Sequence, residues 1–222
     1  PAETADKVKV KGCADLNTFF AFVFRMKHIA RWSLMHNHFP ESLAEHTLNV
    51  AMLSHALALI GNRYLGASYN AERAAALALY HDAEETITGD MPTPVKYFSG
   101  RLRNSYGEIE EAARRQLLGM LPPELLGDYR GFFEKHPEDE ALWKLVKAAD
   151  VLAALIKCIQ ETGAGNKEFC RAEASTRKKL AALACPTLVV TGGRDVLLPP
   201  ERGREVGGWS AEVDHPSLSA GR

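Results

Sequence analysis

Apolar side chains recur every three to four residues along most of this chain, which is the pattern of helices that pack by one face. The clearest case is the segment 43–60, whose helically spaced positions are Leu48, Ala51, Met52, His55 and Leu59. Ser42 stands just before this segment and Glu45 follows three residues later, which is the signature of a capping box. The pattern therefore predicts a long amphipathic helix with His46 in its first turns.

The same period predicts further helices over the segments 16–29, 71–85, 104–120, 122–135, 138–161 and 166–180. Asn70 is a good N-cap for the helix over 71–85, and Gly89 ends it. Between the helices, 33–41 is predicted as a loop, and 90–95 as a rigid loop because Pro92 and Pro94 restrict its backbone.

Beyond Ala184 the pattern changes. Pro186 to Asp195 has the β-branched residues of a strand that runs into a glycine turn, and the residues after it show no period. The strand and turn resemble part of an α/β-hydrolase, but no G-x-S-x-G motif precedes them, so serine hydrolase chemistry is not inferred. The chain is predicted to be an all-α helical bundle over 16–184, with a polar leader over 1–15 and an atypical, loosely packed or disordered tail over 185–222.

Composition narrows the choice of partners and of compartment. The 222 residues carry a net charge of -1, so there is no basic field to attract nucleic acid or an anionic membrane. The apolar run 19–24 is too short for a membrane span. The four cysteines are scattered without C-x-x-C spacing, as expected for reduced thiols. We therefore expect a cytoplasmic protein that acts on a small molecule.

Candidate chemistry centres on His81 and Asp82, at the end of the predicted helix over 71–85. Neighbouring helical residues are about 100° apart, so this pair can flank one ion lying over the groove between them. Glu85 follows His81 by four residues and falls over the same patch, where it could handle a proton. The adjacent Glu84 is expected on the solvated surface.

Two further candidate ligands come from other predicted helices. His46 lies near the start of one, and Asp150 lies in the middle of another, among apolar neighbours. A buried carboxylate needs a cation or strong donors, although Asp150 could instead pair with Lys147. Two imidazoles and two carboxylates suit one divalent ion, Co²⁺, Mn²⁺, Zn²⁺ or Fe²⁺, and such an ion supports hydrolysis of a phosphate ester.

The order His, His-Asp, Asp on helices resembles the HD-domain metal-dependent phosphohydrolases, and longer motifs resemble the bacterial 5′-deoxynucleotidases of the YfbR-like group within them. The resemblance covers roughly 16–180 and rests on RMKHIARW at 25–32, ESLAEH at 41–46, YHDAEE at 80–85, GDMPTPVKYF at 89–98, KAAD at 147–150 and AGNKEF at 164–169. Together these motifs are far more specific than a lone His-Asp pair.

The resemblance implies a role for each matching position. The implied metal ligands are His46, His81, Asp82 and Asp150. The implied catalytic residues are Glu85, Arg31 and Asp82. The implied substrate-binding residues are Arg31, Trp32, Asp82, Asp90, Met91, Pro92, Thr93 and Asp150. Arg31 would orient the phosphate, Trp32 would crowd a ribose 2′-hydroxyl, and the loop from Asp90 to Thr93 would contact the nucleoside. The resemblance also implies a homodimer.

The expected activity is hydrolysis of deoxyribonucleoside 5′-monophosphates, and two other readings stay open. The fold could serve a nucleoside triphosphate or an alarmone, but those substrates need more cations than Arg31, the clear cationic side chain of the expected site. The protein could also bind nucleotides without turnover, which the intact ligand set and Glu85 argue against.

Overall fold

The computed structural model describes residues 18–183, 189–190 and 196–197, and over 18–183 it is helical, as predicted. The chain divides into two units, Pro1–Pro186 and Thr187–Arg222. In the first unit the helices are, in order, α1 (Phe19–Val23), η2 (Phe24–His28), α2 (Leu43–Tyr64), α3 (Ala71–Leu79), α4 (Glu85–Thr88), α5 (Thr93–Lys96), α6 (Gly100–Leu118), α7 (Leu126–Phe133), η3 (Pro137–Asp139), α8 (Glu140–Gly163), η4 (Lys167–Phe169) and α9 (Cys170–Ala182).

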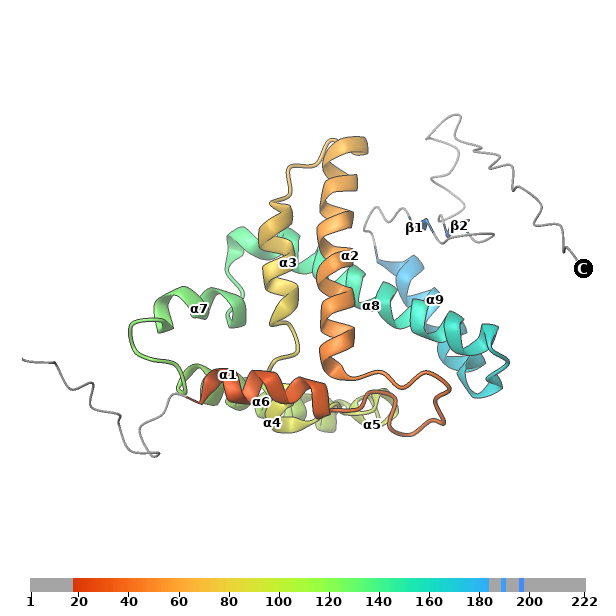
Figure 1. Cartoon of the computed structure of the whole chain (residues 1–222), viewed down its shortest axis with the longest axis horizontal. Helices are drawn as coiled ribbons and strands as arrows, with labels where there is room; N and C mark the ends of the chain where they lie inside the picture. The colour runs from red at the N-terminus through yellow and green to blue at the C-terminus, as the bar shows by residue number, and fades with distance from the viewer. Residues whose placement is uncertain (1–17, 184–188, 191–195, 198–222) are drawn as a thin grey trace, which may run out of the picture. The chain divides into compact units, whose positions relative to one another are not determined.

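One group of helices consists of α2, α3, α8 and α9. Helices α2 and α3 run side by side, α8 packs across both, and α9 packs on α8 (Figure 1). By length and apolarity α2 is the one described helix that would qualify as a membrane span. Its apolar positions Leu43, Val50 and Leu57 are buried in the bundle, which accounts for part of that composition, whereas Leu48, Met52 and Leu59 are exposed.

A second group of helices, α1, α4 and α6, lies across the lower end of α2 and α3 in Figure 1. Its core is aromatic and aliphatic, and the buried side chains are Phe19, Ala83, Leu117, Leu118, Leu121 and Phe133. Phe19 lies at the centre, in edge contact with Tyr129 at 5.2 Å and with Phe133 at 6.0 Å between ring centroids. This core holds the turn between α3 and α4 in place, because Ala83 in that turn is one of its members.

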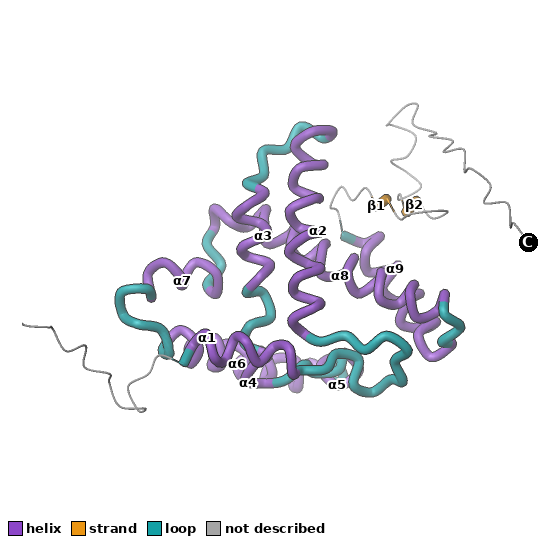
Figure 2. Tube along the Cα trace, viewed as in Figure 1, coloured by secondary structure: helices purple, strands orange, loops and turns teal. Residues whose placement is uncertain are grey.

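The largest correction to the sequence prediction concerns that turn. The helix expected over 71–85 ends at Leu79, and the residues between Tyr80 and Glu84 form turns before α4 begins (Figure 2). Their backbone N–H groups bond three residues back, as from His81 to Ala78 and from Glu85 to Asp82. The imidazole of His81 also meets the Ala78 carbonyl at 2.7 Å. His81 and Asp82 therefore lie between helices rather than on one.

Other boundaries moved for local reasons. Helix α2 continues through Gly61 to Tyr64, because Tyr69 packs where a side chain at Gly61 would stand and Asn62 bonds the backbone of Tyr69. The predicted rigid loop contains the short helix α5, which Pro92 precedes as N-cap. The predicted first helix changes to a 3-10 helix at Phe24.

The second unit is described only at two short strands. Strand β1 (Val189–Val190) pairs antiparallel with β2 (Val196–Leu197). The predicted strand and turn thus lie partly outside the described residues, as do the leader over 1–15 and the rest of the tail.

Candidate active site

His46 reaches the site because α2 begins where the sequence predicts. The Ser42 hydroxyl accepts the backbone N–H of Glu45 at 3.2 Å, and the Glu45 carboxylate accepts the N–H of Ser42 at 2.7 Å. This capping box fixes the first turn of α2. His46 follows directly, and its side chain is 0% exposed. The ring is thereby held inside the bundle, pointing away from solvent.

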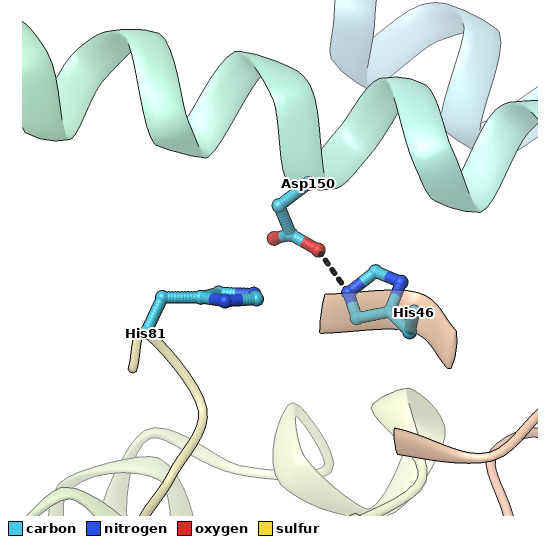
Figure 3. Close-up of side chains that lie close together, drawn as sticks. All are labelled: His46, His81 and Asp150. Atoms are coloured by element: carbon cyan, nitrogen blue, oxygen red, sulfur yellow. Dashed lines mark ion pairs between the residues drawn. The ribbon is translucent and has the colours of Figure 1, made fainter. Parts of the chain in front are cut away.

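Three of the predicted ligands converge. One nitrogen or oxygen atom from each of His46, His81 and Asp150 lies within 4.8 Å of the other two. The three side chains point toward one another from α2, from the turn after α3 and from α8 (Figure 3). Nε2 of His46 and Oδ1 of Asp150 are 3.2 Å apart.

Asp82, the fourth predicted ligand, lies beside this cluster. Its Oδ2 is 3.0 Å from Nε2 of His81 and 3.9 Å from Nε2 of His46, but Asp82 is not a member of the group that lies within 4.8 Å. The structure therefore brings all four side chains to one place and groups three of them most tightly.

The donor set fits a divalent cation. Among the described residues, neither ring nitrogen of His46 nor Nε2 of His81 has an aligned hydrogen-bond partner, although these atoms are buried. Buried polar atoms are normally satisfied, so these nitrogens are suited to a metal. The contact from Nδ1 of His81 to the Ala78 carbonyl directs Nε2 of that ring to the cluster, which is the usual arrangement for a metal-binding histidine.

Opposite charges at the cluster shift the pKa values of His81 and Asp150 toward their ionised forms. Burial alone would lower the pKa of His81, but the carboxylates of Asp82 and Asp150 raise it to about 9. Burial alone would raise the pKa of Asp150, but the close contact with Nε2 of His46 and the charge of Lys147 hold it well below its usual range. A metal ion would take over this role by replacing the proton on the imidazole.

Arg31 faces the cluster from the segment before α2. Its Nη1 is 3.9 Å from Oδ2 of Asp82 and 3.8 Å from Oδ1 of Asp90. Burial alone would lower the pKa of Arg31, but the charges of Asp82, Asp90 and Glu41 raise it. A permanently charged fork thus stands next to the carboxylates, as the sequence motif implies.

Trp32 follows Arg31 and packs on Phe169 of η4, with 5.3 Å between ring centroids. Its backbone has a φ of 58°, the one positive value among the described residues other than glycine. A bulky residue is strained in this left-handed region and stays there only where its surroundings hold it. Such strain is typical of residues at functional sites.

Of the loop predicted to contact the nucleoside, only Asp90 makes a polar contact with another predicted site residue among the described residues. Asp90 meets Arg31, whereas no hydrogen bond or ion pair joins the side chains of Met91, Pro92 or Thr93 to the cluster within 18–183. Thr93 begins α5 and is exposed. The roles of these three residues stay predictions.

The two glutamates after Asp82 differ from each other. Glu85 is nearly buried, its Oε2 has no hydrogen-bond partner among the described residues, and burial together with the charges of Asp82 and Asp90 raises its pKa to about 10. The sequence predicts Glu84 on the solvated surface, and this is wrong. Glu84 is only 5% exposed, and its Oε1 accepts a hydrogen bond from Nη1 of Arg114 at 2.5 Å. The residues near Glu84 in the sequence do not indicate this ion pair, because Arg114 lies 30 residues further along the chain.

Sequence reasoning missed one charged neighbour of the site, Glu41, and named another, Lys147, only as an alternative partner of Asp150. Glu41, quoted only as part of a motif, contacts both Arg31 and Trp32. Lys147 donates to Oδ2 of Asp150 at 2.6 Å, so the alternative pairing of Asp150 with Lys147 is present, while its role as a metal ligand stays a prediction. Arg31 is therefore not the sole cation at the site. The three-residue spacing of Lys147 and Asp150 on a helix was the signal available for this pair.

An all-α fold that gathers His, His-Asp and Asp around one point defines an HD-domain phosphohydrolase. The fold is that of an HD-domain phosphohydrolase from Listeria innocua, with a TM-score of 0.64 and 22% identity over 76% of this chain and 82% of the other. The protein PH0347 from Pyrococcus horikoshii shares the fold with a TM-score of 0.60 and 24% identity, over 75% and 90% of the two chains.

Sequence comparison places the chain more narrowly. The model of the family described as 5′-deoxynucleotidase YfbR-like matches residues 18–190, and the chain belongs to this family. A 5′-deoxynucleotidase of Yersinia pestis is 46% identical over 173 residues, which cover 78% of this chain and 88% of the relative. A relative of the same name from Yersinia pseudotuberculosis matches equally well.

Proposed function

We propose that this protein is a metal-dependent 5′-nucleotidase that hydrolyses deoxyribonucleoside 5′-monophosphates to a deoxynucleoside and phosphate. The observation that carries the proposal is the cluster of His46, His81 and Asp150, in a chain 46% identical to proteins named 5′-deoxynucleotidase. The cluster supplies the ligands that this chemistry needs, and membership of the family indicates the substrate class.

His46, His81, Asp82 and Asp150 would hold one divalent ion, Co²⁺, Mn²⁺, Zn²⁺ or Fe²⁺, since mixed imidazole and carboxylate sites suit these metals. When bound, such an ion polarises a phosphoryl oxygen and makes a water molecule more acidic. The protein's own part is to fix the ligands: the capping box holds His46, and the Ala78 carbonyl orients His81.

Arg31 binds and orients the phosphate. Its Nη1 stands close to 4 Å from both Asp82 and Asp90, near enough to attract the charge and loose enough to turn to a phosphoryl oxygen. Attack by water takes place in line with the departing 5′-oxygen. An arginine at this position would hold the phosphorus for attack from the side of the cluster.

Glu85 handles the proton. With a pKa raised to about 10, the carboxyl group carries a proton at neutral pH and can donate it to the leaving 5′-oxygen, or it can position the water. The positive charge of a nearby divalent ion lowers this pKa and makes the transfer easier.

Trp32 and the loop from Asp90 to Thr93 bind the nucleoside. The indole, held against Phe169, is a rigid surface that would crowd a ribose 2′-hydroxyl and so favour deoxyribose. A small-molecule substrate also agrees with the net charge of -1, which gives nucleic acid no general attraction.

Phosphate release is the direct test. Matched deoxy- and ribonucleoside 5′-monophosphates are assayed after chelation and re-addition of Co²⁺, Mn²⁺, Zn²⁺ or Mg²⁺, with Asp82→Ala as the control. We expect metal-dependent release of inorganic phosphate, faster from deoxy substrates and lost in the variant. Release of pyrophosphate or triphosphate from longer substrates would instead indicate the triphosphate or alarmone hydrolase, and nucleotide binding without any release would indicate a binding module.

We also propose a cytoplasmic homodimer. Large apolar side chains are exposed along one side of α2, at Leu48, Met52 and Leu59. Leu48 borders a shallow cavity of about 400 Å³ next to Phe24 and Leu79. Exposed apolar patches of this kind commonly mark an interface. Light scattering on the wild type and on Met52→Glu tests the proposal, since the dimer mass should fall to that of one chain in the variant.

A further inference from the structure

One oxygen atom links the two residues that we propose to bind the phosphate and the sugar. Oε2 of Glu41 accepts a hydrogen bond from Nε of Arg31 at 3.2 Å and another from Nε1 of Trp32 at 3.0 Å. The side chain of Glu41 is only 9% exposed. Hydrogen bonds to an ionised, nearly buried acceptor are stronger than those between neutral groups.

The backbone sets Glu41 opposite this pair. Ala30 and Ser42 form an antiparallel bridge, the N–H of Arg31 donates to the carbonyl of Glu41 at 3.0 Å, and the N–H of Leu43 donates to that of Ile29 at 2.8 Å. The two ends of the loop over 32–40 are thus joined side by side. Glu41 stands across from Arg31 by register and needs no long reach to contact it.

The contact directs the guanidinium. Because Nε of Arg31 is bound to Glu41, the Nη1 corner is turned to Asp82 and Asp90 on the side of the metal cluster. A free arginine side chain has many rotamers, and holding one of them ahead of binding lowers the entropy lost when the phosphate arrives.

The same contact stabilises the unusual conformation of Trp32. A φ of 58° is costly for a bulky residue and requires contacts that pay for it. The Trp32 carbonyl accepts the N–H of Met35 at 3.0 Å, the ring rests on Phe169, and its Nε1 donates to Glu41. Glu41 is the charged member of this set.

We propose that Glu41 is a positioning residue that sets phosphate affinity and sugar selectivity together, by holding the guanidinium of Arg31 and the indole of Trp32 with one carboxylate oxygen. The inference rests on the substrate roles proposed above for these two residues. Glu41 itself touches neither the substrate nor the metal in this scheme. Its removal should therefore weaken binding and discrimination while the metal cluster stays intact.

The experiment compares Glu41→Ala and Glu41→Gln with the wild type on dAMP and AMP, at saturating metal. For Glu41→Ala we expect KM for dAMP to rise at least about tenfold, which corresponds to about 1.4 kcal/mol. The ratio of kcat/KM for dAMP over AMP should fall at least about fivefold, on the same scale. Glu41→Gln keeps an acceptor oxygen without the charge, so it should recover part of both losses.

Asp139→Asn is the matched control. Asp139 in η3 is likewise nearly buried and accepts a hydrogen bond from an arginine, Nη2 of Arg73 on α3, at 2.7 Å. Thermal unfolding shows whether the two variants lose similar stability. If stability alone mattered, Asp139→Asn would change the dAMP to AMP ratio as much as Glu41→Ala does, and this result would overturn the inference.

A third variant separates the inference from the function on which it rests. Trp32→Phe removes the indole N–H that Glu41 binds, so adding Glu41→Ala to it should cause little further change in the ratio. If Trp32→Phe lowers the ratio and Glu41→Ala leaves both KM and the ratio unchanged, Glu41 has no positioning role. If the wild type itself shows no preference for dAMP, the role of Trp32 is wrong, and the sugar part of this inference is wrong with it.

Discussion

Replacing Glu161 by glutamine should strongly destabilise the fold. Glu161 on α8 is 0% exposed and accepts the backbone N–H groups of His38 and Phe39, each at 3.0 Å. It also accepts Nδ2 of Asn166 at 2.8 Å and Nζ of Lys157. These contacts anchor the loop before α2 to the far end of α8.

The magnitude follows from what the variant leaves behind. Lys157 has 4% of its side chain exposed, and its other acceptor is the carbonyl of Phe39. Removing one partner of a buried ion pair costs about 3 to 5 kcal/mol. Glutamine keeps one acceptor oxygen, so we take the lower end, about 3 kcal/mol. For a domain of this size, such a loss lowers the unfolding temperature by about 6 to 12 °C.

The effect should depend on pH with a definite sign. Burial alone would raise the pKa of Glu161, but the hydrogen bonds from Lys157, Phe39, Asn166 and His38 lower it to about 2. A group whose pKa is lower in the folded than in the unfolded state stabilises the fold above its unfolded pKa, and this stability is lost as pH falls toward the folded value. The wild type should therefore exceed Glu161→Gln most at pH 6 to 7, and the difference should shrink from about pH 5 to pH 3.

Urea unfolding followed by circular dichroism measures this. Glu173→Gln is the control, because Glu173 accepts from Thr162 and Arg177 at 2.6 and 2.8 Å but is partly exposed, and it should cost about 1 kcal/mol or less. Adding Lys157→Met to Glu161→Gln removes the orphaned charge and should restore part of the loss. A cost below about 1 kcal/mol for Glu161→Gln, or a cost that is constant from pH 3 to 7, would refute the reasoning.

Three further predictions concern the site. Asp82→Ala should reduce phosphate release from dAMP at least about a hundredfold, measured with each metal at saturation, because loss of a group that orients the phosphate and the ion removes transition-state stabilisation. Glu85→Gln should lower kcat by about 10²-fold or more with little change in KM; if the carboxyl acts as an acid, wild-type kcat falls as pH rises through its pKa, and the variant lacks that limb. Lys147→Met should tighten Mn²⁺ binding, measured by calorimetry, by roughly two- to fivefold, a modest factor because Lys147 is 65% exposed.

The fold class was predictable because apolar residues recur with helical spacing over most of the chain. Where a predicted helix boundary was wrong, the cause was a contact that the hydrophobic period does not reflect. The run from Ala71 to Glu85 continues the helical pattern past Leu79, but the helix ends there because His81 bonds the Ala78 carbonyl and the aromatic core receives Ala83. Neither contact leaves a mark in local spacing.

In the candidate site, too, some residues could be identified from the sequence and others could not. His46, His81 and Asp150 were identified as potential ligands by residue type and order, and the structure brings them together. Glu41 was missed because its importance lies in two contacts across a loop closed by a backbone bridge. Glu84 was misplaced because its partner, Arg114, belongs to α6. Pairings between distant segments are what a single sequence conceals.

The backbone bridge between Ala30 and Ser42 has one more consequence. His46 follows Glu41 by five positions, and the capping box makes that stretch stiff. With the roles proposed here, the group that grips the phosphate, the ring that meets the sugar and the first metal ligand belong to one inflexible piece of chain. That segment would therefore set the distance between the positions of the phosphorus atom and of the sugar ring. With these roles, substrates would be selected by that distance.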